Sequence, residues 1–365
     1  MEVTNARGQM AAASPAAPKG LPPEDPQALI DHSENLRDEG KYPEARTLFE
    51  RLVAMMEAAH GPEHPKVAGA LNELAQVLCF LGNFPLARST AERAVKINEA
   101  ALGSHHFDVA DSLFQLARVL REQNDLGASQ SILERALAIR EASFGYNHKE
   151  VAPTLYELAS VFLLQGELSA ARPLLERALV INEEAHGPQS RDVGATLNSL
   201  GGVALEQRDL GAARQFLERA LSIDEASMGA NHPQLAATLG NLALVMQIQG
   251  KLDVAKAMYQ RALSIKESAL GPHHPDTAAK LSNLAYLLRQ QGEHAEAKAL
   301  MKRARAIDEA TRGKAHPHSA ATKAGVRRID REKACSVCGV RDVKLQLCSK
   351  CNLKYYCSAD CQVLL

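Results

Sequence analysis

A glycine recurs every 42 residues through most of this 365-residue chain, and no other feature constrains the fold as strongly. A similar segment follows each glycine, for example "GPEHPKVAGALNELA" and "GPHHPDTAAKLSNLA". A block such as "RALVINE" or "RALSIDE" comes later in each period. A fixed period of roughly 20–50 residues indicates a stack of similar supersecondary units. The glycines are Gly61, Gly103, Gly145, Gly187, Gly229, Gly271 and Gly313.

Each period predicts two helices. Val67, Leu71 and Leu74 follow the spacing of one helical face. A second glycine in mid-period, such as Gly82, supplies the left-handed residue that ends the first helix. Neither helix can bury its apolar stripe alone, so the pairs must stack side by side. We therefore expect an all-α fold, a right-handed superhelical solenoid of about seven helix-turn-helix pairs over residues 26–325.

The repeats resemble a known family. Paired helices with "LA", a mid-period glycine and an "RAL" block are similar to the tetratricopeptide repeat, whose usual length is ~34 residues. The 42-residue period, with "HP" after the glycine and "RAL.I.E" near its end, resembles the repeats of kinesin light chains. This resemblance implies that the first helix of each pair lines a concave groove, which binds an extended peptide.

Candidate peptide-binding residues lie where the repeats differ along the predicted first helices. Asparagine can hold a peptide backbone because its side chain both donates and accepts hydrogen bonds. Arginine can bind acidic side chains or a terminal carboxylate. The alternative is that these are ordinary groove-wall residues with no single ligand, and the sequence leaves both open. The candidates are Asn72, Phe114, Arg118, Arg121, Tyr156, Asn198, Tyr286 and Arg289.

A histidine also recurs with the period. Histidines one whole repeat apart cannot share a metal ion, so we expect each to be a loop side chain near the start of a first helix. The glutamate of each "I.E" block, Glu99 through Glu309, is expected on a solvated face. The histidines are His64, His106, His148, His232, His274 and His316.

Six of the seven cysteines lie after residue 334, spaced C-x2-C-x9-C-x2-C-x5-C-x3-C. Two C-x2-C pairs are typical of zinc sites, and such clustering without a secretory signal favours metal over disulfides. With "YYCSADCQ", residues 335–365 resemble a MYND-type finger, a family that holds two interleaved zinc ions. The resemblance assigns Cys335, Cys338, Cys357 and Cys361 to the first zinc, and Cys348 and Cys351 to half of the second.

The family pattern continues with a histidine and a final cysteine that "CQVLL" does not contain. We therefore expect an incomplete, truncated finger with one tightly bound zinc per chain. Residues 326–334 are predicted to be a basic linker between the repeats and the finger. Residues 1–25 are rich in alanine and proline, which predicts a disordered tail.

Charge and hydropathy narrow the functional class. The formal net charge is −1, so general attraction to nucleic acid or to a membrane surface is not expected. No apolar run approaches the ~18 residues of a spanning helix, and residues 1–25 lack the apolar core of a secretory signal. The cytoplasm is the expected location, with the nucleus as the alternative.

The expected function is a non-enzymatic scaffold or adaptor with proteins or peptides as partners, zinc as cofactor and no small-molecule substrate. One alternative is a motor cargo adaptor with kinesin heavy chain as partner, although residues 1–25 cannot form the heptad coiled coil of kinesin light chains. Another is a fragment of a MYND-containing lysine methyltransferase. The repeat frame between Gly61 and Gly313 leaves no room for such a catalytic domain.

Overall fold

The structure, a computed structural model, describes residues 25–311, 313, 317–332, 346–347 and 355–356. Within these residues it contains fifteen α-helices, one short 3-10 helix and two short strands. The first fourteen helices form seven consecutive pairs, which confirms the expected all-α array. The chain divides into two compact units, unit 1 (residues 1–143) and unit 2 (residues 144–365), each with its own core.

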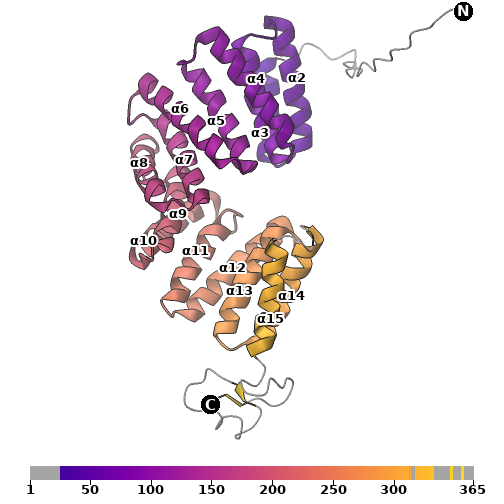
Figure 1. The fold of residues 1–365 in the computed structure, drawn as a ribbon, viewed down its shortest axis with the longest axis vertical. Helices are drawn as coiled ribbons and strands as arrows, with labels where there is room; N and C mark the ends of the chain where they lie inside the picture. The colour runs from indigo at the N-terminus through magenta and orange to yellow at the C-terminus, as the bar shows by residue number, and fades with distance from the viewer. Residues whose placement is uncertain (1–24, 312, 314–316, 333–345, 348–354, 357–365) are drawn as a thin grey trace, which may run out of the picture. The chain divides into compact units, whose positions relative to one another are not determined.

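Unit 1 is built from the first three helix pairs. These are α1 (Pro26–Asp38), α2 (Tyr42–His60), α3 (Pro65–Phe80), α4 (Phe84–Leu102), α5 (Phe107–Glu122) and α6 (Leu126–Phe144). Helices α2 to α5 lie side by side (Figure 1) and bury Phe49, Leu78 and Ile97 almost completely. Burial of one such side chain contributes about 1.5–3 kcal/mol. The shared apolar stripe, and not any single helix, therefore stabilises the stack.

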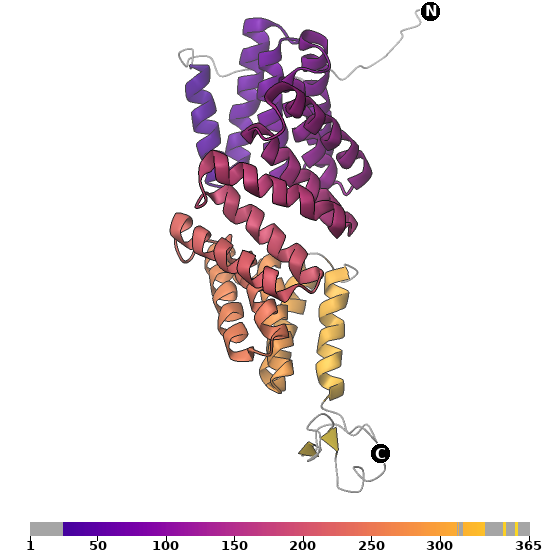
Figure 2. The ribbon, with the colours of Figure 1, turned by 90° about the vertical axis from the view of Figure 1, so that its left-hand side faces the viewer.

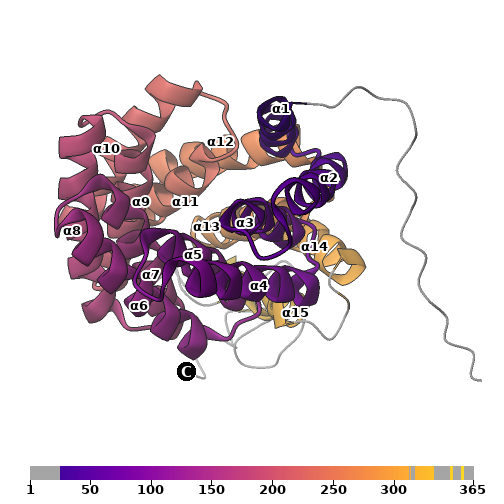
Figure 3. The same cartoon turned by 90° about the horizontal axis from the view of Figure 1, so that it is seen from above.

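Unit 2 contains the other four pairs and one further helix. These are α7 (Ala152–Gln165), α8 (Leu168–His186), α9 (Arg191–Glu206), α10 (Leu210–Met228), α11 (Leu235–Ile248), α12 (Leu252–Leu270), α13 (Pro275–Gln290), α14 (His294–Thr311) and α15 (Pro317–Glu332). Seen from above, α7, α9, α11 and α13 lie on the inner side of this unit, and α8 and α10 lie on its outer side (Figure 3). The first helices of the pairs thus line one continuous face.

The two ends of unit 2 depart from the regular pattern. At the start, a 3-10 helix (Lys149–Val151) precedes α7, and Pro153 occupies the first turn of α7. At the other end, α15 packs against α14 (Figure 2) and continues to Glu332. The helix therefore crosses the boundary that we placed between residues 325 and 326. Most of the expected basic linker is helical.

Residues with positive φ end the first helices, as the sequence predicts. The mid-period glycines Gly82 and Gly166 have φ of 72° and 80°. Asn124 and Arg208 replace this glycine in two repeats and keep the conformation, with φ of 61° and 64°. A non-glycine residue there costs roughly 1–2 kcal/mol, less for asparagine, because its β-carbon crowds the next carbonyl.

The recurring histidines lie at the start of the first helices, as expected, and His64, His106 and His274 are the N-caps of α3, α5 and α13. In His64 the ring Nδ1 accepts a hydrogen bond from the backbone N–H of Lys66 at 3.2 Å. In His274 the ring accepts from the N–H of Asp276 at 3.1 Å. His106, His148 and His232 make the same contact. His316 lies outside the described residues.

The "RAL" arginines connect neighbouring repeats. Arg219 donates to the loop carbonyl of Pro188 at 3.1 Å and pairs with Glu183 at 2.6 Å. The same pair recurs as Arg93–Glu57, Arg135–Glu99, Arg261–Glu225 and Arg303–Glu267. These glutamates are therefore not fully solvated, which differs from the expectation, because each is paired with an arginine. The stacking places the arginine of the following repeat beside each of the paired carboxylates.

The remaining described elements are two short strands. β1 (Gln346–Leu347) and β2 (Tyr355–Tyr356) pair antiparallel, with Gln346 opposite Tyr356. The tail of residues 1–24 and the six clustered cysteines lie outside the described residues. None of the described helices is both long enough and apolar enough to cross a membrane.

Candidate peptide-binding surface

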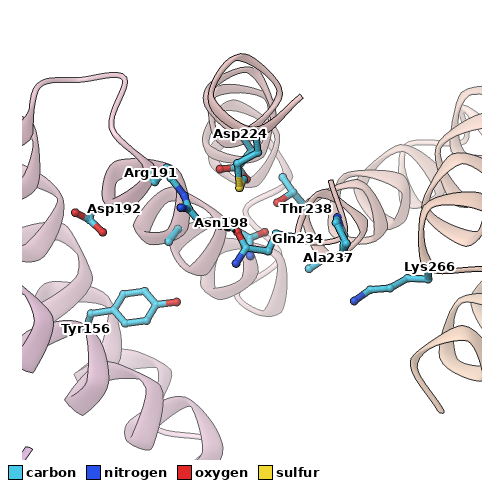
Figure 4. A pocket seen from close by; sticks show the side chains of 12 residues that line it. Tyr156, Arg191, Asp192, Asn198, Asp224, Gln234, Ala237, Thr238 and Lys266 are labelled. Atoms are coloured by element: carbon cyan, nitrogen blue, oxygen red, sulfur yellow. Dashed lines mark hydrogen bonds between the residues drawn. The ribbon is translucent and has the colours of Figure 1, made fainter. Parts of the chain in front are cut away.

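A pocket of about 640 Å³ lies between helices of unit 2 (Figure 4). Tyr156 of α7 and Asn198 of α9 border it, so these two sequence candidates come together. The other lining residues come from the ends of α9 to α12. Those with polar side chains are Arg191, Asp192, Asp224, Gln234, Thr238 and Lys266.

Asn198 keeps a donor available for a ligand, and the Tyr156 hydroxyl can both donate and accept. The Ser199 hydroxyl lies 3.1 Å from the Tyr156 oxygen and 3.2 Å from the Ala195 carbonyl oxygen, and its one proton serves one of them at a time. The phenolic proton is left to donate when Ser199 donates to Tyr156. Asn241 donates to the Asn198 Oδ1 at 3.4 Å. The Asn198 amide nitrogen has no hydrogen bond within the described part of the chain. A peptide carbonyl is the acceptor that both groups suit.

Two glycines let charged side chains lie against the helix backbone of this face. At Gly194 of α9, where most repeats have alanine, a β-carbon would lie 2.6 Å from Asp224 Oδ1. At Gly240 of α11, a β-carbon would lie 3.4 Å from the Nζ of Lys280. Gly194 therefore provides the space that Asp224 occupies, whereas a β-carbon at Gly240 would only touch the end of Lys280.

Burial shifts the pKa of two charged groups in this region. Asp224 is 7% exposed, and burial raises the pKa of its carboxyl, while Arg191, His232 and a hydrogen bond with Thr238 act in the opposite direction. Burial also lowers the pKa of Lys280, and the charge of Lys266 lowers it further.

An apolar patch lies on the same face of unit 2. Leu244 and Ile248 of α11 are 37% and 41% exposed, and Tyr286 of α13 is 38% exposed. Leu244 and Tyr286 occupy the same repeat position, so they belong to adjacent first helices. The Arg289 guanidinium lies 5.9 Å from the centre of the Tyr286 ring. The last two sequence candidates therefore form one cation–π pair beside this apolar ledge (Leu244, Ile248 and Tyr286).

Unit 1 brings two other candidates together. Arg118 and Arg121 of α5 border a pocket of about 310 Å³ with Gln76, Cys79 and Phe80 of α3. Burial raises the pKa of the Cys79 thiol to about 11. The thiol is therefore protonated at neutral pH and packs as a small apolar group.

Asn72 and Phe114 are used for packing between repeats. Asn72 is 8% exposed and donates to the Ser112 hydroxyl at 3.1 Å. The Phe114 ring lies 5.1 Å below the guanidinium of Arg140, which pairs with Asp111 at 2.6 Å. These two candidates thus contribute to the contact between helix pairs in unit 1.

Sequence reasoning missed the second-helix contribution to the pocket. In two repeats the residue between isoleucine and glutamate of the "I.E" block lines the pocket, as Asp224 and Lys266. Its signal was available, because the charge at this position differs from repeat to repeat. The residues there are Asn98, Arg140, Asn182, Asp224, Lys266 and Asp308.

The cysteine cluster suits zinc by its chemistry. Six thiols in two C-x2-C pairs and one later pair offer the soft ligands that structural zinc sites use. The described strands β1 and β2 come directly before Cys348 and Cys357.

Comparison with family models gives two matches. The tetratricopeptide repeat model matches residues 25–100, 66–142, 150–226, 192–268 and 234–310. The MYND finger model matches residues 335–364. The chain matches no curated protein.

Solved structures show similar folds. BtubC (BKLC) from P. vanneervenii is 22% identical, with a TM-score of 0.52 over 63% of this chain and 92% of that chain. The apo form of RapI is 14% identical, with a TM-score of 0.58 over 83% and 99%. A putative kinesin light chain from Podosopora anserina with nearly identical TPR-like repeats is 22% identical, with a TM-score of 0.46 over 56% and 99%.

Proposed function

We propose that this chain, which belongs to the tetratricopeptide repeat family, is a non-enzymatic protein interaction scaffold that binds an extended peptide on unit 2. A helical repeat array presents a long surface for such ligands. The proposal assigns the peptide to the face of α7, α9, α11 and α13. Its partners are proteins, and its location is the cytoplasm or the nucleus.

The pocket at Tyr156 and Asn198 is the observation that carries this proposal. It combines hydrogen-bond donors for a peptide backbone with charged groups for side chains. The apolar ledge offers a second contact for an apolar side chain of the same peptide. The pocket is lined mainly by polar side chains and the ledge is apolar, so together they offer both kinds of contact that an extended peptide needs.

The MYND finger is the second interaction module in this proposal. Cys335, Cys338, Cys357 and Cys361 would hold one zinc ion as thiolates. Zinc bound in this way supplies the cross-link that lets a short segment fold. A scaffold with two recognition modules can bring two partners together. Kinesin heavy chain is the partner in the alternative proposal, a motor cargo adaptor, which the resemblance to kinesin light chains suggests.

Selection of peptides from a random library on the full chain tests the groove assignment. Selected peptides would be titrated against the wild type, Asn198→Ala and Tyr156→Phe, with binding followed by fluorescence anisotropy. Loss of one hydrogen bond should weaken binding by about two- to tenfold for each variant. Ser222→Ala, an exposed position on α10, is the matched control and should bind as the wild type does. Unchanged affinity in both groove variants would exclude this face.

A further inference from the structure

Lys280 is a partly buried cation without a direct partner. It lies on α13, and its Nζ reaches the backbone of α11, 3.4 Å from where a β-carbon on Gly240 would be. No hydrogen bond or ion pair joins it to another residue in the described part of the chain. A partly desolvated ammonium in this position is stabilised by any anion that can reach it.

The space that holds this ammonium is specific to one repeat. The position of Gly240 carries larger side chains in the other repeats, including Ser282, Asn198 and Tyr156. At Gly240 a β-carbon would already touch the Lys280 ammonium, so a larger side chain there would extend into the space beside the α11 backbone that Lys280 uses. The glycine and the lysine therefore form one local feature, which the regular repeat does not contain.

A second cation, Lys266, pairs with Asp276, which lies one turn before Lys280 on α13. Lys266 of α12 lines the pocket, and its charge acts on Lys280. The Lys266 Nζ pairs with Asp276 Oδ2 at 3.2 Å, and that carboxylate also acts on Lys280. The two lysines thus share one carboxylate, which leaves one positive charge unbalanced between them. The other buried carboxylate of this region, Asp224, has Arg191 and His232 as its neighbouring cationic groups.

We propose that Lys266 and Lys280 bind the phosphate group of a phosphorylated residue in the partner peptide. A phosphate monoester carries about −1.5 to −2 charge at pH 7 and three acceptor oxygens. It can bond to both ammonium groups at once and balance their charge while Asp276 stays in place. A carboxylate of the peptide brings only one charge and duplicates what Asp276 already supplies. Lysine binds phosphate as a point charge, so no fixed planar geometry is required.

This inference rests on the proposed function for the peptide that carries the phosphate. Its consequence is that a kinase acting on the partner controls binding to unit 2. The unmodified peptide leaves Lys280 unsatisfied, whereas the phosphorylated peptide pairs with it.

Small-molecule titrations test the site without any peptide. Lysine side-chain NMR signals of the full chain, labelled at Cε, would be followed at pH 7 and constant ionic strength. The three probes are inorganic phosphate, N-acetyl-phosphoserine-N-methylamide and N-acetyl-aspartate-N-methylamide. We expect saturable shifts of the Lys266 and Lys280 signals with both phosphate probes. Their affinity should exceed that of the aspartate probe by about tenfold or more, the effect of one added charge-assisted hydrogen bond.

Variants identify the groups that bind. Lys266→Gln and Lys280→Gln should each lower the affinity for the phosphoserine probe by about tenfold. Lys302→Gln, an exposed position on α14, is the control and should not change it. If Lys280→Gln does not fold, Gly240→Leu provides the second test, because an apolar side chain there extends past the β-carbon position into the space of the ammonium and offers it no hydrogen bond. Gly240→Leu should weaken phosphate binding as well.

The contrary outcomes separate this inference from the proposed function. Equal binding of the aspartate probe would overturn the preference for phosphate. Shifts that do not saturate, or an equal loss in Lys302→Gln, would overturn the site itself. If library peptides still bind the Asn198 face in either case, only this inference has failed. If the phosphate probes bind and no peptide does, the proposed function has failed and the anion site stands.

Discussion

Leu217 of α10 occupies the space that a β-carbon on Gly201 of α9 would take. Built onto Gly201, this carbon would lie 2.5 Å from the Leu217 Cγ, far closer than real contacts allow. Most other repeats have a buried alanine at this position, for example Ala117 and Ala159. The contact between α9 and α10 is therefore closer than the regular repeat permits.

Gly201→Ala should destabilise unit 2 although alanine is the usual residue at this position. Alanine gains about 1 kcal/mol in helix propensity over glycine, but overpacking of a core costs about 1–3 kcal/mol. We expect a net loss of up to about 2 kcal/mol, measured by urea unfolding. The double variant with Leu217→Ala removes the overlap, so the added cost of Gly201→Ala should disappear in that background. Equal costs in both backgrounds would show that Leu217 is not the cause.

The regularity of the repeats decided how much of the fold and of the candidate site could be predicted. The helix pairs, their glycine ends and the histidine positions follow from the period alone, because the same packing contacts recur in each repeat. Gly194 and Gly240 were not recognised as part of a site. Their role depends on Asp224 and Lys280, charged side chains on other helices whose reach the period does not specify. For the same reason, the sequence did not show that Asn72, a groove candidate, is used for packing between repeats.

Acidification should destabilise the end of α2 through His60. Burial lowers the pKa of His60, the charges of Lys66 and His64 lower it further, and its ring stacks on His64. The neutral form of this group is therefore favoured in the folded state. The stabilisation is complete above the ordinary histidine pKa of about 6.5 and is lost as the pH falls through the lower pKa of the folded state.

Replacement of His60 measures this effect. His60→Asn removes the group that titrates, so the melting temperature should fall less between pH 7.5 and pH 5.5 than in the wild type. His273→Asn, another exposed histidine near the end of a second helix, is the control. The same pH dependence in the wild type and in His60→Asn would contradict this explanation.

The arginine–glutamate pairs between repeats should matter more than those within a helix. Arg219 bonds to both Glu183 and the Pro188 carbonyl of the preceding repeat, whereas Arg214 pairs only with Glu218 one turn away. Arg219→Ala should cost about 1 kcal/mol or more, and Arg214→Ala about 0.3–0.5 kcal/mol, in chemical unfolding. If Arg214→Ala lowers the free energy of unfolding more than Arg219→Ala does, the contact between repeats adds nothing to stability.

Cys79 should resist alkylation in the folded chain. With a pKa of about 11, only about 0.1% of this thiol is ionised at pH 8, and the thiolate is the reactive form. Labelling with iodoacetamide, followed by peptide mass spectrometry, should therefore be at least about a hundredfold slower at Cys79 in the native chain than in urea. Arg118 favours the thiolate, so Arg118→Ala should slow the native reaction further. Fast native labelling would mean that the pocket at α3 and α5 opens readily.

The finger should bind one zinc ion tightly through the outer cysteine pairs. The resemblance gives Cys335, Cys338, Cys357 and Cys361 to one complete site, and a structural zinc site needs four protein ligands. Native mass spectrometry of the full chain should show one zinc, which Cys335→Ser removes. Cys348→Ser is the matched control within the same segment and should keep the ion, because the resemblance places Cys348 in the other site. Two zinc ions in the wild type would show that Cys348 and Cys351 belong to a second occupied site, and loss of zinc in Cys348→Ser would show that Cys348 is a ligand of the first; either result would contradict this assignment.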